Sequence, residues 1–153
     1  MSVRSFSVRS ASWPDDRDAL VAVRMEVFVE EQQVPAEIEV DGADAGCVHA
    51  LAVDADGEAI GTGRLDGDGH IGRVAVLAAH RRRGVGTALM RHLTEVARAR
   101  GDARIEISAQ LRAMPFYEAL GYVANGPVYL EAGIEHRQMS LALTPGAGDL
   151  LRG

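Results

Sequence analysis

The chain has 153 residues, 47% of them hydrophobic, and this length and composition suit one globular domain with a core of its own. Its 16 basic and 22 acidic residues give a net charge of -6, which argues against nucleic acid as a partner because phosphate contacts need a basic face. Every basic residue is arginine, which excludes chemistry that uses a lysine of the protein itself.

A short strand and a long amphipathic helix are the first elements that the sequence predicts. Residues 6–10 alternate apolar and polar side chains, as in a half-buried strand. Ser12 and Pro14 then favour a helix start, and apolar residues recur at helical spacing as far as residue 31. The stripe that contains Leu20, Val23 and Val27 predicts that the helix over residues 14–31 packs against a sheet.

Residues 25–63 contain ten acidic side chains and no lysine or arginine. One interpretation is a solvated acidic face on the protein surface. The other is a field that draws a cationic amine towards a binding site. Both interpretations stay open, and each can hold for different residues among the ten.

An antiparallel meander is expected over residues 47–53, 58–65 and 70–77, because Asp-Gly pairs at both connections are strong hairpin signals. A helix follows, since Val85, Leu89 and Leu93 have helical spacing and Gly101 ends the pattern. The next strand is expected over residues 103–109. Because a helix separates it from the strand at 70–77, the crossover rule places the two strands parallel and adjacent. The last strand is expected over residues 137–143.

The connection between the strand at 70–77 and the following helix reads Arg81-x-x-Gly84-x-Gly86. Glycines at a helix start allow close approach of the backbone, and the N–H groups and helix dipole there favour an anion such as a diphosphate. The phosphate loop of nucleotide hydrolases needs a lysine, and the dinucleotide fingerprint needs glycine where this chain has Leu89. The alternative is a turn that only caps the helix.

This motif, preceded by Val74-Ala75-Val76, resembles the coenzyme A signature of the GNAT-type N-acetyltransferases. Residues 110–122 are similar to the family's Asn-x-x-Ala-x-x-Phe-Tyr-x-x-x-Gly-Phe block, with Gln110 where asparagine is usual. Residues 27–32, 41–49 and 129–136 look like the ElaA or YjcF type subgroup. The resemblance covers residues 23–143.

The resemblance implies a mixed α/β fold, with a mostly antiparallel sheet of six to seven strands flanked by about four helices. Residues 1–143 would form one N-acetyltransferase domain, and residues 144–153 are expected to be a flexible tail because they are rich in glycine and proline. Acetyl-CoA would be the cosubstrate, with its pantetheine arm between two splayed strands. The implied coenzyme A-binding residues are Val74, Ala75, Val76, Arg81, Arg82, Arg83, Gly84, Val85, Gly86, Thr87, Gln110 and Tyr117.

The family role of Tyr117 is that of general acid to the departing thiolate, whereas the alternative is a half-buried aromatic with a surface hydroxyl. Many members carry a glutamate base on the central strand, but this chain has Arg73 there and no acid. The general base is therefore left open among a set of candidates chosen by residue type: Glu31, His49, Glu106, Glu131 and His136. No metal is expected, because the five histidines lack close ligand spacing.

The predicted function is transfer of an acetyl group from acetyl-CoA to a primary amine of a small molecule or peptide by direct attack. The alternative is a coenzyme A-binding module with a sensing or interaction role. Cys47 is the only cysteine, so no internal disulfide forms, and the cytoplasm is the expected location. Neither nucleic acid nor a membrane is an expected partner, and a homodimer is left open.

Overall fold

The computed structural model describes residues 5–36 and 42–143 and confirms the predicted mixed α and β architecture. The seven strands are β1 (Phe6–Ala11), β2 (Val48–Asp54), β3 (Ala59–Leu65), β4 (Ile71–Val76), β5 (Arg104–Gln110), β6 (Val123–Glu131) and β7 (Ile134–Ala142). The α-helices of the described residues are α1 (Trp13–Arg24), α3 (Val85–Ala99) and α4 (Met114–Ala119). The short helical segments are η1 (Met25–Glu31), η2 (Asp44–Gly46), η3 (Ala78–His80) and η4 (Leu111–Ala113). Among the described residues, no helix is both long and apolar enough to cross a membrane.

The helix predicted over residues 14–31 is present as two consecutive segments. The first is α1, and the second, η1, continues it as a π-helix to Glu31. Ser12, which marked the predicted helix start, is the N-cap residue, but its hydroxyl makes no capping hydrogen bond. Instead, the Asp16 carboxylate accepts a hydrogen bond from the Ser12 N–H at 2.9 Å, so the cap comes from inside the first turn.

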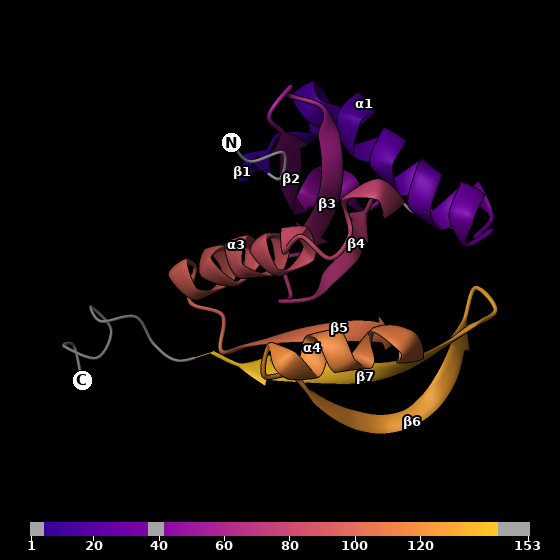
Figure 1. Ribbon diagram of the computed structural model, residues 1–153. Coiled ribbons are helices and arrows are strands. Elements are labelled where there is room, and N and C mark those ends of the chain that lie inside the picture. Colours follow the sequence, from indigo (N-terminus) through magenta and orange to yellow (C-terminus); the bar gives the residue numbers. More distant parts are fainter. Residues whose placement is uncertain (1–4, 37–41, 144–153) are drawn as a thin grey trace.

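The strands form two antiparallel sheets, a four-stranded one in the order β1-β2-β3-β4 and a three-stranded one in the order β5-β7-β6. Figure 1 shows α1 against the first sheet, α4 against the second, and α3 between them on one side. The parallel neighbours predicted from the crossover rule, β4 and β5, meet at one bridge, between His70 and Glu106. Beyond this bridge the strands diverge, so the single sheet that was expected is divided in two.

A β-bulge interrupts the pairing of β3 with β4. Thr62 pairs with Ala75 and Arg64 pairs with Gly72, so two residues of β4 lie opposite one residue of β3. Arg73, one of these two residues, has a φ of 52°. Bulges bend the strand that carries them, and here the bend falls where β4 departs from β5.

The first sheet is covered on both faces, which explains the run of buried residues along β2. On one face α3 comes very close to β3, because a Cβ at Gly61 would lie 3.0 Å from the side chains of Val85 and Leu89. On the other face Val23 and Val27 pack against Ala75. These contacts hold β4, the start of α3 and η1 in fixed relative positions.

The strand β6 is an element that sequence patterning did not anticipate. Its alternation is interrupted by Asn125, Gly126 and Pro127, and its register against β7 shifts between Asn125 and Tyr129. Since β6 lies at the edge of its sheet, Pro127 removes no hydrogen bond to a second neighbouring strand. The strand expected over residues 137–143 begins three residues earlier, at Ile134.

Candidate active site

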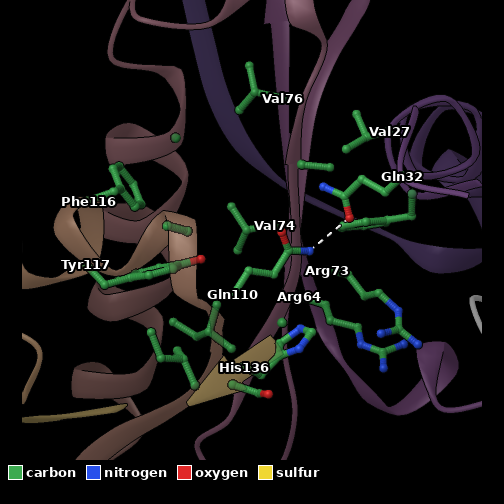
Figure 2. A pocket seen from close by; sticks show the side chains of 18 of the residues that line it. Val27, Gln32, Arg64, Arg73, Val74, Val76, Gln110, Phe116, Tyr117 and His136 are labelled. Carbon is green, nitrogen blue, oxygen red and sulfur yellow. Dashed lines mark hydrogen bonds between the residues drawn. The ribbon is translucent and has the colours of Figure 1, made fainter. Parts of the chain in front are cut away.

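A pocket of about 970 Å³ lies where β4 and β5 diverge (Figure 2). Of the residues expected to bind coenzyme A, all except Arg83 line this pocket. Four of the five candidate bases line it as well, and His49 does not. One cavity therefore brings together the glycine motif, the central strand and Tyr117.

The glycine motif forms one end of the pocket, at the N-terminus of α3. Gly84 is the N-cap residue with a φ of 84°, and a Cβ built on it would meet no atom within 4 Å. A Cβ at Gly86 would lie 3.4 Å from the ring of Phe116, so the glycine leaves room between α3 and α4. The first N–H groups of a helix have no acceptor within it and carry its positive dipole end. This end of the pocket is suited to an anionic group.

Arg81 holds the glycine loop against two neighbouring elements. Its two Nη atoms donate hydrogen bonds to the Glu31 carboxylate at 2.7 and 2.6 Å, and its Nε donates to the carbonyl oxygen of Val76 at 2.9 Å. The hydrogen bond from Arg81 lowers the pKa of Glu31. Glu31 is consequently a poor proton acceptor, and Arg81 links the glycine loop to η1 and β4.

The other two arginines of the motif differ in position. Arg82 lines the pocket and has a φ of 64°. The Nη1 atom of Arg83 lies 3.4 Å from Nδ1 of His80, and its side chain does not line the pocket. The structure therefore brings only Arg82 of this pair to the candidate site.

Tyr117 projects into the pocket from α4, and Figure 2 shows its hydroxyl directed toward the cavity. Its ring packs edge-on against Phe116 and Tyr122, with centroids 4.9 and 5.8 Å away. Burial raises the pKa of Tyr117 to about 12. The hydroxyl therefore keeps its proton at neutral pH and can donate it.

Gln110 ends β5, where it is held across the pocket by a residue that the sequence did not indicate. Its Nε2 donates a hydrogen bond to Oε1 of Gln32 at 2.9 Å, drawn as a dashed line in Figure 2. Its Oε1 accepts a hydrogen bond from Nε of Arg112 at 3.1 Å. The two glutamines are 78 positions apart, so no local pattern could have linked them.

His136 lies on β7 at the opposite end of the pocket and is only 6% exposed. Its Nδ1 is 2.7 Å from the carbonyl oxygen of Ile134. Since a carbonyl oxygen only accepts, Nδ1 carries the proton, and Nε2 of the neutral ring has an available lone pair. Nε2 lies 3.8 Å from a carboxylate oxygen of Glu131, and the ring stacks on Tyr129. The hydroxyl of Ser108 bonds to that of Tyr129 and lies 3.4 Å from Glu131.

The remaining acidic candidate, Glu106, lies where the two sheets meet. Its carboxylate is 3.6 Å from Nε2 of His70 and 2.7 Å from Arg104, and its backbone N–H donates to the carbonyl oxygen of Gly69 at 2.9 Å. These contacts tie the start of β5 to the first sheet. Glu106 therefore joins β4 and β5 at the point where the two strands diverge.

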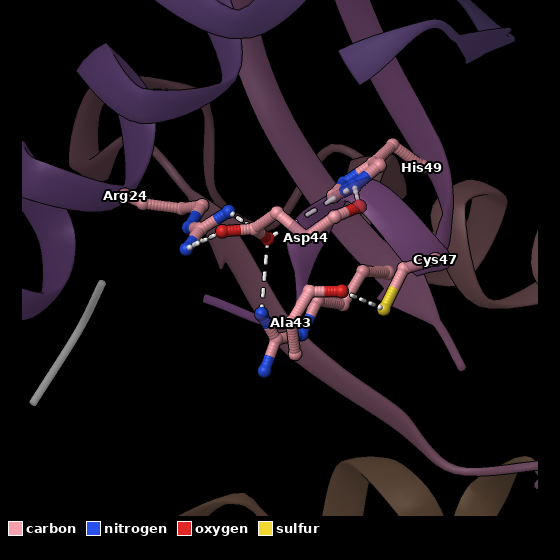
Figure 3. Close-up of polar contacts among 6 residues, drawn as sticks. Arg24, Ala43, Asp44, Cys47 and His49 are labelled. Atoms are coloured by element: carbon pink, nitrogen blue, oxygen red, sulfur yellow. Dashed lines mark hydrogen bonds and ion pairs between the residues drawn. The ribbon is translucent and has the colours of Figure 1, made fainter. Parts of the chain in front are cut away.

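His49 belongs to a buried ion-pair network beside the pocket (Figure 3). Asp44 is 3% exposed, and its Oδ1 accepts hydrogen bonds from Arg24 at 2.7 Å and from Arg64 at 2.9 Å. Burial would raise the pKa of Asp44, but the hydrogen bonds from the two arginines outweigh it and hold that pKa below its ordinary value. The carbonyl oxygen of Asp44 accepts a hydrogen bond from His49, whose ring stacks on Trp13. Burial lowers the pKa of His49, which favours the neutral ring.

Asp44 and Glu31 are two of the ten acidic residues between positions 25 and 63, and both form ion pairs with arginines. Asp44 is buried between two arginines, and Glu31 is bound to Arg81, so neither belongs to a purely solvated face. The arginine partners all lie outside that stretch of sequence. Charge counting along the chain could not reveal these long-range pairs.

Among the pocket residues that the sequence analysis did not name as site residues are Gln32, Arg64 and Arg73. One signal did exist, because Arg73 occupies the central strand, where the family that the sequence resembles often has a glutamate. Within the described part of the chain, no group of three or more His, Cys, Asp or Glu side chains is suited to hold a metal ion. That no metal takes part in the reaction stays a prediction.

Comparisons with known proteins agree with this geometry. Residues 15–143 match the model of the acetyltransferase (GNAT) domain. The chain is 41% identical over 121 residues to the uncharacterized N-acetyltransferase YjcF of Bacillus subtilis, over 76% of this chain and 86% of that protein. The structure of an acyl-CoA N-acyltransferase from Pseudomonas aeruginosa is 33% identical, with a TM-score of 0.80 over 90% of this chain and 100% of that one. Escherichia coli ElaA is 28% identical, with a TM-score of 0.78 over 88% of this chain and 98% of that one. The chain therefore belongs to the GNAT acetyltransferase family, as an N-acetyltransferase of the type that includes YjcF and ElaA.

Proposed function

We propose that the protein transfers the acetyl group of acetyl-CoA to a primary amine within the pocket between β4 and β5. The observation that supports this most is that a single pocket extends from the glycine motif past Tyr117 to His136. The start of α3 suits the diphosphate of coenzyme A. In addition, β4 is the edge strand of the first sheet, so its outer backbone N–H and C=O groups are available to an extended arm.

Acetyl-CoA supplies an acetyl thioester, and the reaction forms an amide bond to the amine nitrogen while the carbon–sulfur bond breaks. We assign Tyr117 as the general acid, because its neutral hydroxyl points into the pocket and can protonate the departing sulfur. We assign His136 as the general base. Its Nε2 takes the proton that the amine loses, directly or through a water molecule.

The contacts of the other candidate bases support this assignment. Glu31 is bound to Arg81, Glu106 joins the two sheets, and His49 lies outside the pocket. Glu131 is more exposed than His136, with 52% of its side chain accessible, and lies beside the imidazole. It is placed to stabilise the imidazolium that forms when Nε2 takes up the proton.

The glycine motif can be tested with a pair of matched variants. We expect Gly84→Asp to weaken acetyl-CoA binding by at least about tenfold, because a carboxylate there repels the diphosphate at close range. Gly57→Asp is the control, since Gly57 has a φ of 83° against 84° for Gly84 and neither has an atom within 4 Å of a built Cβ. Both variants place an aspartate at a similar positive φ, and only Gly84 lines the pocket. Equal acetyl-CoA affinity in a calorimetric titration of the two variants would refute the assignment.

The proposed base can be tested by His136→Gln. We expect kcat at saturating acetyl-CoA to fall by about tenfold or more, because the amine loses its proton acceptor, while the dissociation constant for acetyl-CoA is unchanged. His92→Gln is a suitable control, because His92 bonds to Ser10 and does not line this pocket. If both variants retain wild-type kcat, His136 is not the base.

The proposal extends to the organisation of the chain. We propose that residues 1–143 form one N-acetyltransferase domain, which the family match over residues 15–143 supports. The tail expected over residues 144–153 lies outside the described residues. The cytoplasm remains the proposed location, and light scattering of the purified protein would show whether it forms the homodimer that the sequence left open.

A further inference from the structure

The pocket has one end near the glycine motif and another end near His136, and the charged side chains differ between the two walls of the His136 end. Figure 2 shows Arg64, Arg73 and His136 on the opposite side of the Gln32–Gln110 hydrogen bond from Val76. Val76 precedes the glycine motif, where the proposed function places the diphosphate of coenzyme A. The end with the arginines and His136 is therefore the part of the pocket that is left for the amine.

Two arginines lie in the wall formed by the first sheet, and Asp66, which follows β3, lines the pocket as well. Arg64 comes from β3 and Arg73 from the bulge of β4, and both line the pocket. Arg64 is held in place by its 2.9 Å hydrogen bond to buried Asp44, and its side chain is 13% exposed. Guanidinium groups that are fixed in this way are the preferred partners of carboxylates in proteins, because their planar N–H groups match two carboxylate oxygens.

The facing wall, formed by the second sheet, provides groups that accept protons and hydrogen bonds. His136 presents the lone pair of Nε2, and the carboxylate of Glu131 lies 3.8 Å from it. Ser108 lies within 3.4 Å of the same carboxylate. These groups attract an ammonium group and can receive its proton.

We infer that the acceptor is a small amino carboxylate, that is, a molecule whose primary amine and carboxylate are a few bonds apart, as in a free amino acid. Its carboxylate contacts Arg64 and Arg73, and its amine faces His136 and Glu131. A purely cationic acceptor such as a polyamine would place a second positive charge against the arginines, at an electrostatic cost. This inference rests on the proposed function and adds the substrate class to it.

The test compares amino acids with their carboxamides, which keep the amine and the size but lose the negative charge. Thiol release from acetyl-CoA is measured for each pair with the wild-type protein, with Arg73→Gln and with Arg91→Gln. Arg91 is an exposed arginine of α3 that does not line this pocket, and it serves as the control. Comparing variants cancels the difference in amine basicity within each pair.

We expect Arg73→Gln to raise the KM of the amino acid by about tenfold or more, because the variant loses a charge-assisted hydrogen bond to the carboxylate. The KM of the carboxamide should be unchanged. The KM for acetyl-CoA stays constant, and Arg91→Gln behaves as wild type. If Arg73→Gln changes the KM of the amino acid and of its carboxamide equally, the inference is wrong. It is also wrong if the wild-type protein prefers the carboxamide and Arg73→Gln does not alter that preference. In both cases turnover of an amine still supports the proposed function. Absence of turnover with every amine overturns both.

A second measurement needs no variant and so does not depend on the folding of Arg73→Gln. A carboxylic acid that lacks the amine, matched in carbon skeleton to the best acceptor, should inhibit the wild-type enzyme competitively against the amine and not against acetyl-CoA. If instead the corresponding amine without a carboxylate competes and the acid does not, the arginine wall does not recognise the acceptor.

Discussion

Replacing Tyr117 with phenylalanine is expected to lower kcat by roughly 10²-fold or more, the range that a positioned general acid contributes. The substitution removes only the hydroxyl, and the ring keeps its edge-on contacts with Phe116 and Tyr122. Acetyl-CoA affinity should therefore stay within about twofold, because an interaction that acts on the departing sulfur lowers kcat rather than binding. Steady-state kinetics with a colorimetric thiol assay, together with calorimetric titration of acetyl-CoA, measures both quantities.

Tyr122→Phe is the matched control, since Tyr122 packs against Tyr117 but does not line the pocket. It should retain most of the wild-type kcat.

The pKa of about 12 for Tyr117 also predicts the pH dependence of activity, because the protonated form of this residue is the active one. Activity that depends on this group is present throughout the neutral range and is lost only as pH rises through that value. Wild-type kcat in Tyr117→Phe would remove Tyr117 from the mechanism.

The second large effect is expected on stability, from Asp44→Ala. The carboxylate is the partner of Arg24, whose side chain is 1% exposed, and of Arg64, whose side chain is 13% exposed. Removing one member of a buried ion pair leaves the other charges desolvated and uncompensated, which costs about 3–5 kcal/mol. We expect the free energy of unfolding, measured in urea by circular dichroism, to fall by that amount.

Glu95→Ala provides the comparison, because Glu95 pairs with Arg98 on the surface of α3 and 71% of its side chain is exposed. Exposed pairs of this kind contribute little, so the loss should stay below about 0.5 kcal/mol. A loss at Asp44 no larger than at Glu95 would show that the buried network does not stabilise the fold.

The same network predicts how stability changes with pH. The folded-state pKa of Asp44 lies below the value of about 3.9 that an aspartate has in an unfolded chain, so the unfolded state binds the proton more tightly. The contribution of Asp44 is complete above that unfolded value and is lost as pH falls through the lower folded value. Asp44→Ala should consequently show a shallower loss of stability between neutral and strongly acidic pH than the wild-type protein.

Local patterns in the sequence predicted the elements that form the coenzyme A end of the pocket. The spacing of Val85, Leu89 and Leu93 indicated α3, and all three side chains are buried in the core as that pattern requires. Gly84 and Gly86 marked the helix start at which the structure places a positive φ and a close contact with Phe116. Such features depend on neighbours within a few residues, so they can be recognised in the sequence.

Long-range contacts account for what the sequence could not predict. The ion pair of Glu31 with Arg81 and the hydrogen bond of Gln32 with Gln110 join segments that are distant in the chain, and no periodicity encodes them. The bulge at Arg73 lies where β4 departs from β5, and nothing in the sequence around Arg73 indicated a bulge or a positive φ. The places of the two histidines in the sequence did not show that His136 lies in the pocket and that His49 lies outside it.

Amine-dependent release of coenzyme A from acetyl-CoA, with mass spectrometric detection of the acetylated amine, is the measurement to make first. The panel should contain amino acids, their carboxamides, polyamines and peptides, with a thermal-shift titration of acetyl-CoA alongside. We predict a thermal shift in the wild-type protein that needs a higher acetyl-CoA concentration in Gly84→Asp, and turnover with at least one amine that Tyr117→Phe suppresses. A clear shift without turnover of any amine would favour a coenzyme A-binding module, and the absence of both would contradict the assignment of the pocket between β4 and β5.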